Sequence, residues 1–157
     1  MPNEIERKFL VIPERWHSLE KPQPQLLHQG YLLNTKQKTI RVRQTNTQGF
    51  ITIKGPTQGI TRHEFEYEIP WQEAGELLVQ FCDVSIKKNR YKIQHQQHGW
   101  DVDCFLDANN GLIVAEIELS SETEPFEKPD WLGEEVSHDP RYYNANLINH
   151  PFSEWGQ

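Results

Sequence analysis

Two glutamates and a lysine near the N-terminus have the spacing of side chains that could bind a metal ion and an anion together. Residues 4–8 read Glu-Ile-Glu-Arg-Lys. In an extended chain, residues two apart lie on one face, so Glu4, Glu6 and Lys8 would share a face. Two such carboxylates can share a hard divalent cation, which prefers oxygen ligands, and the lysine could bind an anion that the metal also holds. A solvated strand face is the simpler explanation of these five residues alone.

The same spacing recurs along the chain, and each repeat carries charges of mainly one sign. Residues of like charge fall two apart at Glu4/Glu6, Arg41/Arg43, Glu64/Glu66, Lys88/Arg90, Asp101/Asp103 and Glu116/Glu118, and Lys54 adds a single base. A solvated sheet face normally mixes both signs, because like charges side by side repel. Two folds remain open: a sandwich with its charges in water, or an inverted barrel with its charges inside. The periodicity does not decide between them.

Eight extended segments and three helices are predicted to position these residues. Alternation of apolar and polar residues predicts strands at Glu4–Ile12, Leu26–Leu33, Thr39–Gln44, Phe50–Lys54, Arg62–Ile69, Ser85–His95, Gly99–Leu106 and Leu112–Leu119. Apolar residues at three- and four-residue spacing predict a helix over Trp71–Cys82, and shorter helices are expected at Pro13–Leu19 and Asp139–Asn149. Residues 122–133 are expected to be irregular. The fold class is therefore α+β, mainly β, and eight mostly antiparallel strands suffice to close a barrel with room inside.

Composition bounds the kind of protein. The 157 residues suit a single domain, residues 1–157, and the net charge of −7 argues against a general nucleic-acid binder. Cys82 and Cys104 are the only cysteines and have neither a metal-site spacing nor a disulfide framework. No apolar stretch approaches a membrane span, and acidic residues stand where a signal peptide needs a basic start. A cytoplasmic protein that binds no membrane is expected.

The inverted barrel would have a definite chemistry. Buried charges cost several kcal/mol each unless they are paired, so its interior would need to be solvated, cross-paired or filled by a charged ligand. Cations alone would indicate a simple anion site. Cations together with clustered carboxylates indicate a polyanion and the divalent metal that accompanies it, which is the pairing that phosphoryl transfer requires.

The series of motifs resembles the CYTH superfamily, the triphosphate tunnel metalloenzymes. The start of the chain is similar to the ExExK signature of that family. The likeness continues through Gly30-Tyr31-Leu32, Arg41-Val42-Arg43, Thr52-Ile53-Lys54-Gly55, Arg62–Ile69, Lys88–Tyr91, Trp100–Phe105, Ala115–Leu119 and Asp139–Leu147. It covers essentially all 157 residues, and the full series is far more specific than the signature alone.

The resemblance implies a fold and a set of site residues. The fold is an eight-stranded antiparallel closed barrel, a tunnel with a charged interior and a few outer helices, which binds a linear triphosphate with Mg²⁺ or Mn²⁺. The implied substrate-binding residues are Lys8, Tyr31, Arg41, Arg43, Lys54, Lys88 and Arg90. The implied metal ligands are Glu4, Glu6, Asp103, Glu116 and Glu118, and the implied catalytic residues are Glu4, Glu6, Lys8, Glu64 and Glu66. Asp101 and Glu68 extend the acidic set and could instead face solvent.

Among family members, the chain most resembles the small bacterial inorganic triphosphatases. The expected reaction is therefore metal-dependent hydrolysis of tripolyphosphate, or a related polyphosphate, to pyrophosphate and phosphate by a monomer or homodimer. The alternatives are a class IV adenylyl cyclase, a triphosphatase for thiamine triphosphate or nucleoside triphosphates, and a non-catalytic polyphosphate-binding module. The final predicted helix could close one end of the tunnel or pack outside it.

Overall fold

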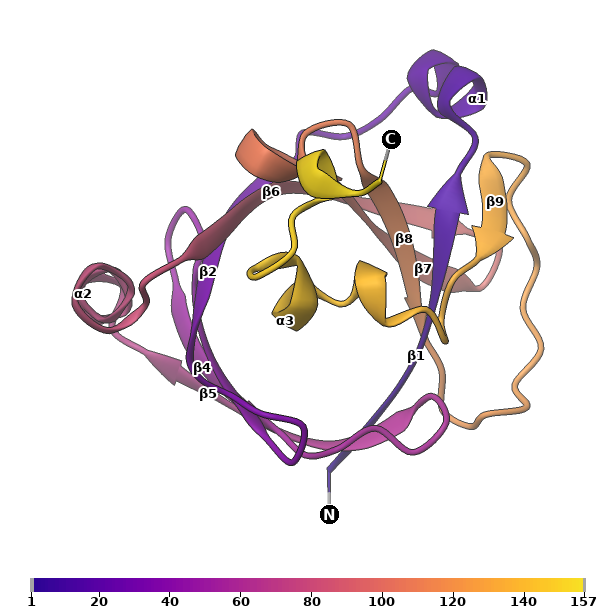
Figure 1. Ribbon diagram of the computed structural model, residues 1–157. Coiled ribbons are helices and arrows are strands. Elements are labelled where there is room, and N and C mark those ends of the chain that lie inside the picture. The colour runs from indigo at the N-terminus through magenta and orange to yellow at the C-terminus, as the bar shows by residue number, and fades with distance from the viewer. Residues whose placement is uncertain (1, 157) are drawn as a thin grey trace.

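Antiparallel strands coil into a closed barrel in the computed structural model, which describes residues 2–156 (Figure 1). Around the sheet the order is β5-β4-β3-β2-β6-β7-β8-β1-β9, and β5 also pairs with β1, so eight strands close the ring and β9 lies outside it. The strands are β1 (Asn3–Val11), β2 (Gln25–Asn34), β3 (Thr39–Gln44), β4 (Gly49–Lys54), β5 (Thr61–Ile69), β6 (Ser85–His95), β7 (His98–Phe105), β8 (Ile113–Glu118) and β9 (Leu132–Glu135). The predicted eight-stranded antiparallel barrel is confirmed.

Strand β1 closes the barrel by changing partners along its length. Its first residues pair with β5, where Glu4 lies opposite Arg62. Its later residues pair with β8, where Glu6 lies opposite Glu118 and Lys8 opposite Glu116. The residues of the N-terminal signature therefore lie at the seam where the two ends of the sheet meet.

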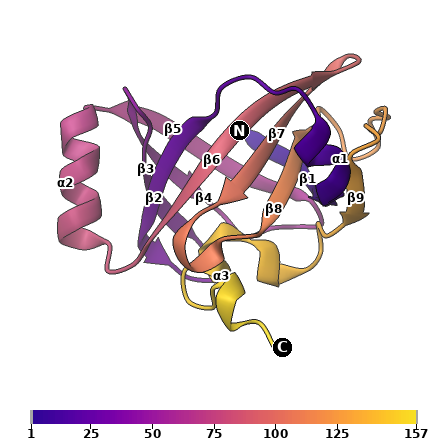
Figure 2. The same ribbon diagram turned by 90° about the horizontal axis from the view of Figure 1, so that it is seen from above.

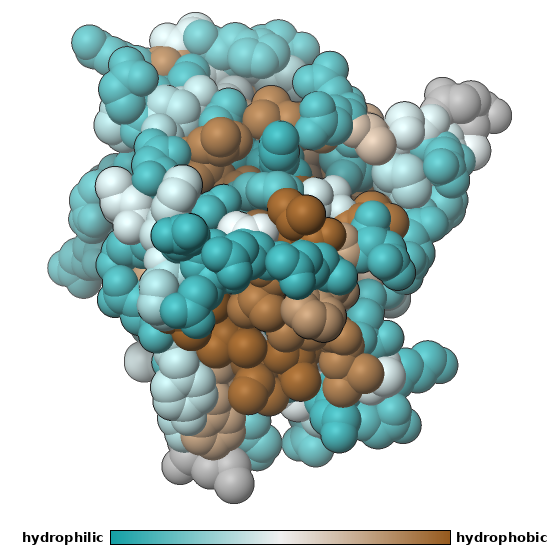
Figure 3. All heavy atoms as spheres, turned by 90° about the vertical axis from the view of Figure 1, so that its left-hand side faces the viewer, coloured by the Kyte–Doolittle hydropathy of each residue, from teal (hydrophilic) through white to brown (hydrophobic). Residues whose placement is uncertain are grey.

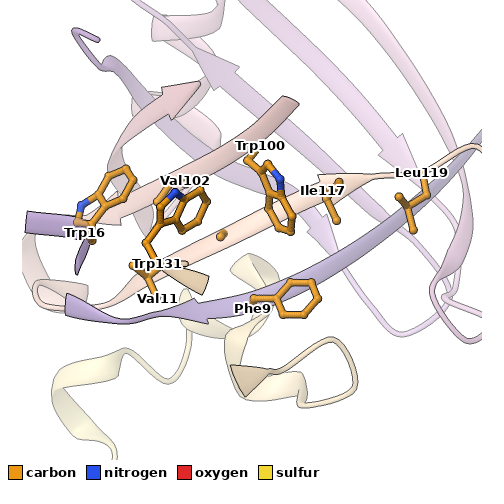
Figure 4. Packing of buried hydrophobic residues seen from close by; sticks show 9 residues of the cluster. Phe9, Val11, Trp16, Trp100, Val102, Ile117, Leu119 and Trp131 are labelled. Carbon is orange, nitrogen blue, oxygen red and sulfur yellow. The ribbon is translucent and has the colours of Figure 1, made fainter. Parts of the chain in front are cut away.

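The outer wall of the barrel is apolar where β1, β7 and β8 meet. Trp16 from α1 (Pro13–Ser18) and Trp131 pack on the outside of these strands (Figure 4). The Trp100 ring makes edge contacts with Phe9 at 5.7 Å and with Trp131 at 5.8 Å between ring centroids, an arrangement that aromatic pairs favour. Because these residues alternate with the charged ones, their outward position directs the charges inward and excludes the sandwich.

Helix α2 (Trp71–Phe81) covers a second part of the outer wall through Ala74 and Leu78. Two glycines allow the close approach: a Cβ on Gly30 would lie 2.8 Å from the Cβ of Cys82, and one on Gly49 would lie 2.6 Å from the Cβ of Ala74. Apolar side chains also appear among polar ones on the surface of this side of the molecule (Figure 3).

The C-terminal segment lies across one end of the barrel (Figures 1 and 2). The prediction of a single helix over Asp139–Asn149 was wrong. The chain instead forms η2 (Pro140–Tyr142), α3 (Asn144–Leu147) and, after a gap, η3 (Phe152–Glu154). Asp139 does accept a hydrogen bond from the backbone of Arg141, as a helix cap would, but Tyr143 is extended and its hydroxyl donates to the Ser137 carbonyl at 2.8 Å.

Residues 122–131 are irregular, as predicted, but strand β9 begins at Leu132, at the end of the segment expected to be irregular. It pairs with β1 through Phe9 and Val11, with a register shift between them. Pro125 and Pro129 precede it, and they made the whole stretch resemble a loop. Predicted and observed bounds of the other strands differ by one residue at most, within the usual spread of element ends. Within residues 2–156, no helix has the length and apolarity needed to cross a bilayer.

Candidate active site

The barrel encloses a cavity of about 250 Å³ whose walls are mainly charged. Glu4, Glu6 and Lys8 all line it, so they share one face, as the alternation predicted, and that face is the inner one, as the family resemblance implied. The other lining residues from the predicted set are Tyr31, Arg41, Arg43, Lys54, Glu64, Glu66, Lys88, Arg90, Glu116 and Glu118. Asp101 also lines the cavity, and Asp103 is fully buried behind it. The structure thus brings together side chains from all eight strands of the ring.

Near the start of β1, a lysine is shared by two glutamates. The Lys54 ammonium lies 3.1 Å from a Glu4 carboxylate oxygen and 3.7 Å from Glu64, and Arg62 lies 3.5 Å from Glu4. Burial opposes the charge of Glu4, but the basic neighbours outweigh it and lower the pKa of Glu4 to about 2. Burial, together with the hydrogen bond and charge of Glu4, raises the pKa of Glu64 to about 7. Glu64 can therefore take up or release a proton near neutral pH.

Lys8 is held between two carboxylates at the middle of the cavity. Its ammonium lies 2.6 Å from Glu116 and 2.9 Å from Glu6. Burial disfavours each charge, but the ion pairs outweigh it, so that the pKa of Glu6 falls to about 2 and that of Lys8 rises. This pairing keeps Glu6 and Lys8 charged and fixes where all three side chains point.

Asp103 binds two of the predicted phosphate-binding bases. Its carboxylate lies 2.7 Å from the Lys88 ammonium and accepts two hydrogen bonds from the Arg90 guanidinium, at 2.8 and 2.9 Å. Arg90 also lies 3.5 Å from Glu116. Burial lowers the pKa of Lys88 to about 7, and the charge of Arg90 adds to the effect although Asp103 opposes it. Both oxygens of Asp103 are thus bound by bases.

Two arginines have donors to spare. The Nε atom of Arg43 donates to the Gln29 side-chain oxygen at 2.9 Å, and Arg43 forms no ion pair with any of residues 2–156. Arg41 lies 3.7 Å from Glu66, but its buried Nε atom has no hydrogen-bond partner. Burial and the neighbouring Arg41 and Arg90 lower the pKa of Arg43, although a guanidinium stays charged in proteins. The part of the cavity wall formed by Arg41 and Arg43 can therefore bind an anion.

The carboxylates have the donor chemistry of a site for a hard divalent ion. Glu6 and Glu118 lie directly opposite each other on neighbouring strands. Burial and the charges of Glu4 and Glu6 raise the pKa of Glu118. A bound cation would relieve this repulsion. It would also replace the proton that Glu4 and Glu64 share in its absence. As the side chains stand, no three acids or histidines among the described residues are arranged to hold a metal, because lysines and arginines occupy many of the carboxylates.

Several residues of the cavity wall were absent from the predicted site residues, among them Arg62, Ser137 and Asn144. Arg62 continues the alternation of Glu64 and Glu66 and could have been found by it. Ser137 and Asn144 come from the C-terminal segment, where no periodic pattern marks an inward side chain. That segment lines the cavity through Tyr143, Asn144 and Ala145, so it closes one end of the barrel and does not pack only on its outside.

Comparisons with known proteins agree with this geometry. The CYTH domain family matches residues 2–148. The chain is 47% identical over 156 residues to an inorganic triphosphatase of Acetivibrio thermocellus, covering 99% of each protein. It is 35% identical over 152 residues to an inorganic triphosphatase of Nitrosomonas europaea, covering 92% of this chain and 95% of the relative. A crystal structure of an inorganic triphosphatase superposes with a TM-score of 0.65 at 31% identity, covering 94% of this chain and 95% of the other.

Proposed function

Because the chain belongs to the CYTH family, we propose that it is a divalent-metal-dependent hydrolase that cleaves inorganic triphosphate to pyrophosphate and phosphate inside the barrel. The observation that carries the proposal is the cavity itself, where bases with unused donors face clustered carboxylates. The two relatives named inorganic triphosphatase, which match nearly the whole chain, support the same reaction.

The bases would bind the triphosphate chain along the tunnel. Within residues 2–156, Arg43 uses only its Nε atom, so its terminal nitrogens can donate to non-bridging phosphate oxygens, and Arg41 lines the cavity beside it. Arginine suits this role because its planar fork matches phosphate geometry. The other bases would complete the substrate site: Lys8, Lys54, Lys88 and Arg90, with Tyr31 beside Arg41 on the neighbouring strand. Binding a polyanion here would give the Arg43 guanidinium the counter-charge that no described carboxylate supplies.

The carboxylates would hold Mg²⁺ or Mn²⁺. We assign this role to Glu4, Glu6, Glu116 and Glu118, all of which line the cavity. When bound, the ion would neutralise charge on the phosphate oxygens and orient the attacking water. Asp103 would become a ligand only if Lys88 and Arg90 released it, so we infer that its main role is to position those two bases.

We assign the proton-acceptor role to Glu64, which lines the cavity and lies 3.7 Å from the Lys54 ammonium. Without a bound cation, burial and the neighbouring Glu4 raise its pKa to about 7, in the range of a general base. In the proposed step, the oxygen of a water molecule bonds to a terminal phosphorus and the bridging P–O bond breaks. Pyrophosphate leaves, and the proton of the water passes to Glu64. Glu66 would hold Arg41 in position, since it lies 3.7 Å from that guanidinium and accepts from the Thr52 hydroxyl at 3.0 Å.

The test is a comparison of substrates and metals. Phosphate release from tripolyphosphate, ATP and thiamine triphosphate would be measured with Mg²⁺, with Mn²⁺ and with a chelator. We expect the highest kcat/KM on tripolyphosphate and no turnover in chelator. Faster turnover of either organic triphosphate would replace the proposed substrate, and tight binding of all three without products would indicate a polyphosphate-binding module.

We further propose that residues 1–157 form one domain that acts as a monomer or homodimer in the cytoplasm. The net charge of −7 disfavours nucleic acid as a partner, and no membrane association is expected. Sedimentation analysis of the purified protein would give the oligomeric state.

A further inference from the structure

Asn144 lies in the C-terminal segment that closes one end of the barrel. It begins α3 and lines the cavity. Its Oδ1 atom accepts hydrogen bonds from the Lys88 ammonium at 2.8 Å and from the Gln29 amide at 3.3 Å. Lys88 is 1% exposed and Gln29 is fully buried. Asn34 also donates to the Ala145 carbonyl at 2.8 Å, so α3 is held in place at this end.

The cations on either side fix the orientation of the Asn144 amide. The Asp103 carboxylate 2.7 Å away favours the charged form of Lys88. Because an ammonium only donates hydrogen bonds, the atom 2.8 Å away is the Asn144 oxygen. The Arg43 guanidinium also only donates, so the Gln29 oxygen faces it and the Gln29 nitrogen faces Asn144. The cations on either side therefore set the orientation of both amides.

This orientation leaves unused donors on three neighbouring groups. The Nδ2 atom of Asn144 donates to none of residues 2–156. Lys88 has three hydrogens, of which Asp103 and Asn144 use one each. The terminal nitrogens of Arg43 donate to no described residue. A phosphoryl group with three free oxygens could accept from all three groups.

We propose that Asn144 is a specificity-determining residue that recognises the free terminal phosphoryl group of the substrate, so that the chain binds end-first against α3. This inference rests on the proposed triphosphate hydrolysis. A neutral amide suits the task, because an aspartate could accept the same bonds from Lys88 and Gln29 but would place a negative charge where the phosphoryl group must lie. An ester group on that phosphoryl end would collide with the closed end of the barrel.

The first experiment separates recognition of phosphate from support of Lys88. KM and kcat for tripolyphosphate would be measured for Asn144→Asp, Asn144→Ala and a matched control, Asn149→Asp, at an exposed residue just after α3. We expect Asn144→Asp to raise KM roughly 10-fold to 100-fold, the range for a hydrogen bond to a charged group. Asn144→Ala should raise KM less, and the control should match wild type. If Asn144→Asp matched wild type while Asn144→Ala failed, Asn144 would only position Lys88 and the inference would be wrong.

The second experiment uses the wild-type protein alone, so it does not depend on how the variants fold. Binding of tripolyphosphate, its terminal monomethyl ester and its dimethyl ester blocked at both ends would be measured from the rise in melting temperature with Mg²⁺. Each methyl group removes a similar amount of charge, so charge alone predicts that the first and the second methyl group lower the affinity equally. We expect the monomethyl ester to bind only slightly more weakly than tripolyphosphate, and the dimethyl ester to bind at least roughly tenfold more weakly than the monomethyl ester. Equal losses of affinity at the two steps would overturn the inference.

The two proposals can fail separately. Wild-type protein that hydrolyses tripolyphosphate but shows equal losses with the esters would refute end-first binding alone. Wild-type protein that discriminates against the doubly blocked chain but releases no phosphate would refute the proposed reaction alone.

Discussion

Replacing Asp103 by asparagine should be among the most destabilising single changes in the barrel. Asp103 is fully buried and receives contacts of 2.7, 2.8 and 2.9 Å from Lys88 and Arg90. Its replacement leaves two buried cations without their main counter-charge. Breaking a buried ion pair from one side costs about 3–5 kcal/mol. We expect the free energy of unfolding to fall by about 3 kcal/mol, at the lower end of this range, because asparagine keeps one acceptor oxygen.

The assay is thermal or urea unfolding, with an exposed ion pair as the control. For a chain of this size, about 3 kcal/mol corresponds to a fall of roughly 6–12 °C in melting temperature. Asp130→Asn removes a partner of Arg15 across 4.0 Å with both side chains exposed, and it should cost less than about 1 kcal/mol. Equal effects of the two substitutions would refute our account of the interior.

The pH dependence gives a further check on Asp103. Burial opposes its charge, but Lys88 and Arg90 outweigh burial and lower the pKa of Asp103. Stability from a carboxylate with a lowered folded-state pKa is present above its unfolded value and is lost as pH falls through the folded value. The stability gap between wild type and Asp103→Asn should therefore persist at neutral pH and close only below the unfolded value of 3.8.

Three further predictions concern the acids and the wall of the barrel. In chelator, Glu64→Gln should become progressively more stable than wild type between pH 4.5 and 7. The raised folded-state pKa of Glu64 stabilises wild type at low pH, and this stability is lost as pH rises through that pKa. A difference in melting temperature between the two proteins that does not change with pH would contradict this. Glu118→Gln should raise the melting temperature in chelator slightly, because it relieves repulsion from Glu6. Calorimetry should show at least a roughly tenfold loss of Mn²⁺ affinity in this variant, and unchanged affinity would exclude Glu118 as a metal ligand. Gly30→Ala should cost about 1–3 kcal/mol in urea unfolding, because its Cβ would lie 2.8 Å from that of Cys82; an unchanged midpoint would show that α2 is loosely packed.

The alternation of apolar and polar residues predicted the strands of the barrel, because a period of two is a local property of each strand. Glu4, Glu6 and Lys8 share the inward face for that reason, as do Arg41 and Arg43. Which face is inside depends on how the whole sheet closes, and no single strand carries that information. The family resemblance decided it, and the tryptophans packed on the outer wall explain it physically.

The C-terminal segment could not be predicted in the same way. Its path depends on tertiary contacts, such as the Tyr143 hydroxyl on Ser137 and Asn144 on Lys88. The Asp-Pro start favoured one continuous helix, and these contacts override it. The position of Asp103 behind the cavity wall was likewise hidden, because its spacing from Asp101 is the same as that of the acids that line the cavity.

The most direct test of the central claim compares inward and outward carboxylates in one assay. Phosphate release from tripolyphosphate with Mg²⁺ or Mn²⁺ would be measured for wild type, for the double variant Glu4→Gln/Glu6→Gln, and for a control double variant at exposed positions, Glu127→Gln/Glu134→Gln. We predict rapid release by wild type and the control and almost none by the inward variant. Release by the inward variant at the wild-type rate would contradict a catalytic role for the charged interior.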